Sequence, residues 1–193
     1  MSTHLVFDIE TLCLRETAAI LSIGIVPVDF SEEFDYQDLI DRSWFIKFDA
    51  RDQIERLGRT KDEDTINWWK QQDRETIRSQ VKPLETDVTL EEGLKQTAEW
   101  MQSVEGYNRK SSWVWTRGGM DAMITEHACI QVERQPLFPF WVVRDVRTAV
   151  DIIAGTDRGY CQVDAVLPEV QKHHPVHECA YDAMMIRDPK IES

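Results

Sequence analysis

Long apolar runs are missing from this 193-residue sequence. A membrane-spanning helix needs about 20 consecutive apolar residues, whereas the longest candidate, residues 18–28, is short and contains Ser22 and Pro27. The first residues also lack the basic and apolar stretches of a secretory signal peptide. We therefore expect a soluble, cytoplasmic protein with no membrane association.

Glycine and proline are scarce, with 8 and 7 residues, and neither gathers into a repeat or a linker-like run. This excludes a collagen-like chain, and the absence of sustained heptads excludes a coiled coil. Low-complexity disorder is excluded because 42% of the residues are hydrophobic, including 7 tryptophans, which is enough to build a core. Since single domains commonly have ~100–200 residues, we expect residues 1–193 to form one domain.

Basic residues are too few for a protein that wraps a nucleic-acid duplex. There are 22 Lys and Arg against 35 Asp and Glu, which gives a net charge of −13. A protein that binds a duplex by neutralising its phosphates is normally basic. If nucleic acid is the substrate, the contact must be local, or it must be bridged by divalent metal ions bound to carboxylates.

The four cysteines form no Cys-x-x-Cys pair, so we expect reduced, mostly buried thiols. A zinc site made from Cys161, Cys179 and the histidines at 173, 174 and 177 is disfavoured. Structural zinc sites usually contain a closely spaced pair of ligands, which this sequence does not provide.

Strand patterns dominate the first fifty residues. The apolar or alternating segments are residues 5–9, 19–28 and 42–48. Short connections between them predict an antiparallel three-stranded meander. The following segment is helical, with helices expected over 62–72, from a cap at Asp73 to 81, and over 89–104.

The last eighty residues alternate between strand and helix patterns. We expect strands at 112–115 and 140–143, helices at 121–132, 146–154 and 179–186, and a loop over 168–176. Gly155 ends the second of these helices. This order predicts an α/β or α+β domain with a mixed sheet.

Two carboxylates lie on one side of the first strand, because side chains at i and i+2 point the same way. They are Asp8 and Glu10 in the segment Phe-Asp-Ile-Glu. Such oxygen-rich pairs are preferred by Mg²⁺ and Mn²⁺. Taken alone, the pair is much more typical of a solvated strand end.

Three further residues stand out downstream. Asp121 follows a strand and a Gly-Gly turn, a position that, taken alone, is more typical of a helix N-cap. Asp182 lies on an apolar helix face and needs a partner there. His177 precedes it by five residues, on the expected loop, where local hydrogen bonds could satisfy it.

Together, these motifs resemble the DEDDh (DnaQ-like) family of 3′–5′ exonucleases, which has a ribonuclease H-like fold. The order is Asp8-x-Glu10, then Asp121 after a strand, then His177 and Asp182. The resemblance covers nearly the whole chain. It implies an α/β fold in which a mixed sheet, an antiparallel three-stranded meander plus parallel strands, is flanked by helices.

The resemblance also implies a role for each residue. The carboxylates that bind two Mg²⁺ or Mn²⁺ ions are matched by Asp8, Glu10, Asp121 and Asp182. His177 matches the catalytic histidine, a general base that deprotonates the attacking water. The implied reaction releases 5′-mononucleotides from 3′ ends of single-stranded nucleic acid, with DNA slightly favoured. The alternatives are an exoribonuclease acting on RNA or RNA overhangs, and a binding module without turnover.

Within the family, the chain is most similar to the phage DexA-type branch, which includes bacterial exoribonucleases. The supporting segments are residues 19–26, 66–69 and 144–148. The chain departs from the pattern at Leu12 and Met120, where relatives more often have Thr and Phe. Both changes affect positions expected near the 3′-terminal nucleotide.

Contacts with the substrate are harder to predict. By resemblance, Thr11 and Leu12 line the terminal nucleotide, although ordinary packing beneath the second strand explains them equally well. Trp69 pairs with Ile66 on a helix and is expected in the core. Trp68 points elsewhere on that helix, where it could stack on a base or cover an exposed patch.

Basic side chains near the expected site are few. Arg147 follows the last strand and is either a phosphate contact or part of a solvated helix face, beside Asp145 as the helix cap. Arg109, Lys110 and Arg117 form a small basic group that we expect to be solvated surface.

Overall fold

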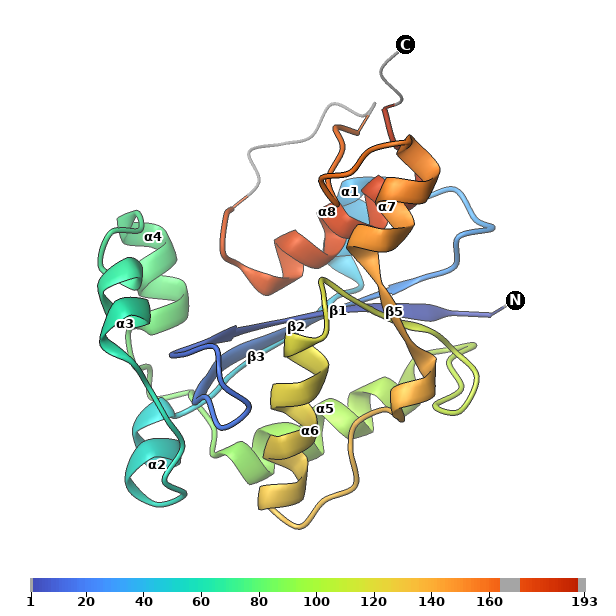
Figure 1. The fold of residues 1–193 in the computed structure, drawn as a ribbon. Coiled ribbons are helices and arrows are strands. Elements are labelled where there is room, and N and C mark those ends of the chain that lie inside the picture. The colour runs from blue at the N-terminus through green and yellow to red at the C-terminus, as the bar shows by residue number, and fades with distance from the viewer. Residues whose placement is uncertain (1, 164–170, 191–193) are drawn as a thin grey trace.

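The computed structural model describes residues 2–163 and 171–190. Its centre is a five-stranded sheet with the strand order β3-β2-β1-β4-β5 (Figure 1). The strands are β1 (His4–Thr11), β2 (Ile20–Val28), β3 (Trp44–Lys47), β4 (Val114–Thr116) and β5 (Val143–Asp145). β1, β2 and β3 form an antiparallel meander, while β4 and β5 run parallel to β1. The predicted mixed sheet is therefore confirmed.

Helices cover both faces of this sheet (Figure 1). One face packs against α5 (Leu90–Ser103) and α6 (Met120–Gln131), and the other against α1 (Tyr36–Asp41) and α8 (Pro175–Arg187). α7 (Val146–Ala154) packs beside α8. Four short helical segments directly follow β3 and lie at its side of the sheet (Figure 1); they are α2 (Ala50–Glu55), α3 (Glu63–Trp69), α4 (Arg74–Thr76) and a π-helical turn, Ile77–Val81.

β1 divides its side chains between the two faces, as a period of two requires. Leu5, Phe7 and Ile9 enter the core beneath α5 and α6. Val6 enters the core formed with α1 and α8. Asp8 follows Val6 by two residues, so its side chain is directed to the face that α8 covers.

Side-chain caps set most helix boundaries where the sequence predicts them. Asp62, Asp73 and Thr89 each accept a hydrogen bond from a backbone N–H in the first turn of α3, α4 and α5. At the other end of α7, Gly155 takes a left-handed conformation with φ of 68°, which glycine adopts without steric cost. These capping residues therefore allow the helix ends to be predicted from the sequence.

Three expectations about secondary structure are wrong. The connections in the meander are not all short, because α1 lies between β2 and β3, and Asp35 and Asp38 form a capping box for it. The segment predicted as strand 140–143 begins as a 3₁₀ turn, Phe140–Val142, and β5 starts only at Val143. The last helix begins at Pro175 rather than 179, since proline's fixed φ suits the first helical turn.

Part of the predicted 168–176 loop, residues 168–170, lies outside the described residues. All four cysteines are free and buried, as predicted. Among the helices that the structure describes, none combines the length and apolarity needed to cross a membrane.

Candidate active site

Asp8 and Glu10 lie on β1 opposite Gly24 and Ser22 of β2. The start of α8 packs directly on this part of β2. A Cβ atom at Gly24 would lie 2.5 Å from both the carbonyl carbon of Pro175 and the nitrogen of Val176. Only glycine allows this approach, which places the first turn of α8 beside the two carboxylates.

Asp121 reaches the same place from the end of β4. Gly119, not Asp121, is the N-cap of α6, and Asp121 lies in the first turn with only 4% of its surface exposed. The interpretation of Asp121 as a simple helix cap is therefore wrong. The turn before it is fixed by the Gly118 N–H, which donates to Asp145 Oδ2 at 2.7 Å.

Asp182 is buried on α8 and is bound by Arg117. Arg117 Nη2 lies 2.5 Å from Asp182 Oδ1, and Arg117 Nη1 donates to the carbonyl of Gly159 at 2.8 Å. Arg109 donates to the carbonyls of Pro136 and Leu137. The expectation that this basic group is merely solvated surface is thus wrong for both arginines, because each has fixed partners.

The electrostatics show that the predicted carboxylates converge. Burial, and then the charges of Asp121, Glu10, Glu178 and Asp182, raise the pKa of Asp8 well above its ordinary range. Burial and the charge of Asp182 raise the pKa of Asp121 to about 7. Burial raises the pKa of Asp182 to about 6, although Arg117 opposes the shift. Such shifts mark carboxylates that are short of positive charge.

Glu178 is a member of this cluster that the sequence analysis missed. Its charge contributes to the raised pKa values of Asp8, Glu10, Asp121 and Asp182. Because α8 begins at Pro175, Glu178 and Asp182 are four residues apart on one helix face. The four-residue spacing could have identified Glu178 in the sequence, but the predicted helix started at residue 179 and left Glu178 outside it.

His177 lies in the first turn of α8, not on a loop. Its Nδ1 is 2.7 Å from the hydroxyl of Tyr36 on α1. Burial lowers the pKa of His177, and burial raises that of Tyr36 to about 12, so both groups are neutral near pH 7. When Nδ1 carries the proton and donates to Tyr36, Nε2 keeps a lone pair that can accept a proton from water.

The two residues predicted to contact the 3′-terminal nucleotide, Thr11 and Leu12, are packed against other parts of the protein. Thr11 is buried, and its hydroxyl donates to the carbonyl of Cys13 at 2.8 Å. Leu12 packs against Ala19, Leu21 and Trp69. Their contact with a nucleotide stays a prediction.

The two adjacent tryptophans have different surroundings. Trp69 is 2% exposed and its Nε1 donates to the carbonyl of Thr11 at 3.0 Å, which confirms its place in the core. Trp68 is 40% exposed, and its ring meets His173 edge-on with centroids 4.7 Å apart. Stacking of Trp68 on a base stays a prediction.

Arg147 is exposed in the first turn of α7, and its charge lowers the pKa of both Asp121 and Asp182 slightly. The charge of Arg147 therefore acts on two of the predicted carboxylates. Asp145 caps this helix through the Thr148 N–H and also holds Gly118. A phosphate contact by Arg147 stays a prediction.

The carboxylate cluster fits divalent cations. Its donors are hard carboxylate oxygens, two of its members, Asp121 and Asp182, are buried, and Arg117 is the one cation bonded to the predicted carboxylates within the described residues. A pocket of about 340 Å³ opens beside Glu178 and Asp182, with Arg117 and Lys172 also on its wall. Negative charge in excess of nearby positive charge, next to an open pocket, is the environment that Mg²⁺ and Mn²⁺ occupy.

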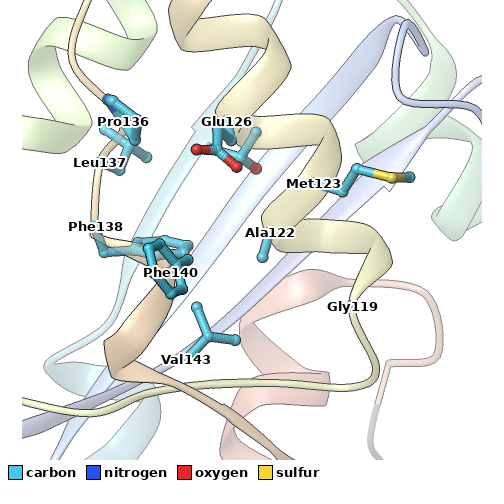
Figure 2. A pocket seen from close by; sticks show the side chains of 10 residues that line it. Gly119, Ala122, Met123, Glu126, Pro136, Leu137, Phe138, Phe140 and Val143 are labelled. Atoms are coloured by element: carbon cyan, nitrogen blue, oxygen red, sulfur yellow. The ribbon is translucent and has the colours of Figure 1, made fainter.

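A second, more apolar pocket of about 270 Å³ lies between α6 and residues 136–143. Figure 2 shows Met123 and Glu126 of α6 on one side and Phe138, Phe140 and Val143 on the other. Phe140 is 78% exposed. The pocket begins at Gly119 and Ala122, next to Asp121 in the chain.

Solved structures of exonucleases share this fold. The chain aligns with the nuclease domain of 3′hExo, a DEDDh family member bound to rAMP, with a TM-score of 0.60 and 13% identity, over 95% of this chain and 89% of that one. Cell-death related nuclease 4 gives a TM-score of 0.61 and 14% identity over 97% and 63%. The E. coli ExoI–ssDNA complex gives 0.52 and 10% over 80% and 30%.

The chain thus covers only 30–39% of the length of exonuclease I. No curated protein shows significant similarity to it. A sequence model described as the 3′–5′ exoribonuclease Rv2179c-like domain matches residues 3–188. The predicted DEDDh resemblance and ribonuclease H-like fold are confirmed, and the chain belongs to the Rv2179c-like family of 3′–5′ exoribonuclease domains.

Proposed function

We propose that this domain hydrolyses phosphodiester bonds at the 3′ end of single-stranded nucleic acid and releases 5′-mononucleotides, using two Mg²⁺ or Mn²⁺ ions. The observation that carries the proposal is the convergence of Asp8, Asp121 and Asp182 from three separate segments, where burial and neighbouring carboxylates raise the pKa of each. Residues 1–193 would act as one catalytic domain in the cytoplasm.

The carboxylates of Asp8, Glu10, Asp121 and Asp182 would hold the metal ions. Bound divalent ions activate water near neutral pH and stabilise charge on the entering and leaving oxygens. His177 would take the proton of the attacking water on Nε2, while Tyr36 holds its Nδ1. Arg147, exposed beside the cluster, would contact a substrate phosphate.

RNA is the substrate that we propose first. The sequence slightly favours DNA, but the family is described as exoribonuclease, and this description carries more weight. DNA remains the second candidate, because exonuclease I, which shares the fold, is described in complex with ssDNA. The two differ by the 2′-hydroxyl, which is recognised through a few contacts at the terminal nucleotide.

The test uses matched RNA and DNA oligonucleotides labelled at the 5′ end. Each is incubated with Mg²⁺, Mn²⁺ or EDTA, beside an Asp182→Asn variant that keeps the size of the side chain. We expect a ladder that shortens from the 3′ end, is lost in EDTA and in the variant, and is faster on RNA. Binding without cleavage under either metal would favour the binding-module alternative instead.

A further inference from the structure

Three metal-ligating side chains meet at the edge of the carboxylate cluster. Glu10 comes from β1, His173 from the segment before α8, and Glu178 from the first turn of α8. One ligand atom from each lies within 4.8 Å of the other two. Small side-chain rotations would bring all three to the bond lengths of ~2.0–2.2 Å that divalent transition metals form with nitrogen and oxygen.

The backbone holds His173 in place for this arrangement. His173 has a φ of 56°, an unusual conformation for a residue other than glycine, and its N–H donates to Glu178 Oε1 at 2.9 Å. The carbonyl of Lys172 accepts a hydrogen bond from the hydroxyl of Thr76 on α4 at 3.2 Å. The ring of Trp68 packs edge-on against the imidazole. The side chain is therefore positioned by neighbours on three elements.

The negative charges of Glu10 and Glu178 favour a bound cation between them. No donor among the described residues reaches the carboxylate of Glu10, and after burial the charge of Glu178 raises the pKa of Glu10 more than the charge of Asp121 does. His173 Nδ1 is 3.5 Å from Glu178 Oε1, a distance longer than a good hydrogen bond. Both side chains are partly exposed, at 31% and 36%, so an ion pair between them would add little stability.

Glu178 also adds to the negative charge of the cluster. The four predicted carboxylates together with Arg117, which is bonded to Asp182, carry a formal charge of −3. Glu178 lies at the edge of this cluster with Glu10 and His173, where its carboxylate adds a further negative charge and a further oxygen ligand for a cation.

We propose that Glu10, His173 and Glu178 form a divalent-cation site that shares Glu10 with the proposed metal centre and prefers Mn²⁺ to Mg²⁺. The preference follows from the imidazole, because nitrogen ligands suit transition metals, whereas Mg²⁺ selects oxygen. The inference rests on the proposed function, because Glu10 is also a ligand of the metal centre proposed there.

The test is pulsed electron paramagnetic resonance of Mn²⁺ bound to the full chain, which detects a directly coordinated imidazole nitrogen. We expect nitrogen coupling in the wild type, its loss in His173→Ala, and its retention in the matched control His177→Ala. Mn²⁺ affinity should fall at least tenfold in His173→Ala, with a much smaller change for Mg²⁺. Coupling that persists in His173→Ala, or that is absent from the wild type, would overturn the site.

Two further measurements keep the outcome clear. Thermal unfolding in EDTA shows whether each variant folds, and Glu178→Gln, which preserves size, provides a second removal of a ligand that should also weaken Mn²⁺ binding at least tenfold. The oligonucleotide assay separates the two proposals. Nitrogen coupling without cleavage would refute the nuclease and support this site, whereas cleavage without coupling would refute this site alone.

Discussion

Replacing Asp121 by Asn should stabilise the metal-free protein at pH 8. The native environment raises the pKa of Asp121 from an ordinary 3.8 to about 7. At ~1.36 kcal/mol per pKa unit, the folded state disfavours the ionised carboxylate by about 4 kcal/mol. Burial of an amide without a full set of hydrogen bonds costs ~1–3 kcal/mol, so we expect a net gain of about 2 kcal/mol.

The sign of the pH dependence follows from the raised pKa. The native state holds the Asp121 proton more tightly than the unfolded chain does, so this group's contribution to stability is complete below about pH 4 and is lost as the pH rises through about 7. At pH 5 most of the native carboxyl is protonated, and the advantage of Asn should shrink by about 2–3 kcal/mol. The variant should then be no more stable than the wild type.

The assay is thermal unfolding followed by circular dichroism, in EDTA at pH 8 and pH 5 and in excess Mn²⁺ at pH 8. A gain of about 2 kcal/mol corresponds to a rise in Tm of about 4–8 °C for a domain of this size. Mn²⁺ should reverse the order, because ligand at 100 times its Kd stabilises the wild type by about 2.7 kcal/mol and the variant by less.

The matched control is Asp35→Asn at the exposed cap of α1. Asn caps a helix as well as Asp does, so this change should leave Tm nearly constant at both pH values. If Asp121→Asn lowered Tm in EDTA at pH 8 and Mn²⁺ stabilised it as strongly as the wild type, the metal cluster would be refuted.

Four other variants test single contacts. His177→Ala should keep the fold and Mn²⁺ binding but lose most activity; near-normal turnover would remove His177 from the mechanism. Tyr36→Phe should lower kcat about tenfold with little change in KM, since it removes the hydrogen bond that orients the imidazole. Recovery of the wild-type rate at a higher substrate concentration would contradict this role. Gly24→Ala should destabilise the fold by more than 2 kcal/mol in chemical denaturation, because its Cβ would overlap the backbone at Pro175. Trp68→Ala should weaken single-strand binding by about 1–3 kcal/mol in fluorescence anisotropy; unchanged affinity would assign it to packing.

Local rules explain which parts of the fold were predictable from the sequence. The alternation of β1 places Asp8 and Glu10 on one side whatever the rest of the chain does. Asp62, Asp73 and Thr89 mark helix starts because each cap acts within three residues. These features needed no knowledge of distant contacts.

The parts that were missed depend on long-range packing or on one boundary. α1 has only six residues, so its apolar pattern is too short to distinguish it from a loop, and Tyr36 remained unnoticed as the partner of His177. Glu178 was missed because the helix start was placed four residues late. The bond between Arg117 and Asp182 joins residues 65 positions apart, which no local pattern reports.

The contact between β1 and α8 has a consequence for how the protein is made. The strand that bears Asp8 and Glu10 is synthesised before the helix that bears His177 and Asp182, which follows more than 160 residues later. At ~5–20 residues per second, the two are separated by roughly 10–30 s of synthesis. A chain that ends before α8 therefore lacks His177 and Asp182, and the proposed metal site cannot form in it.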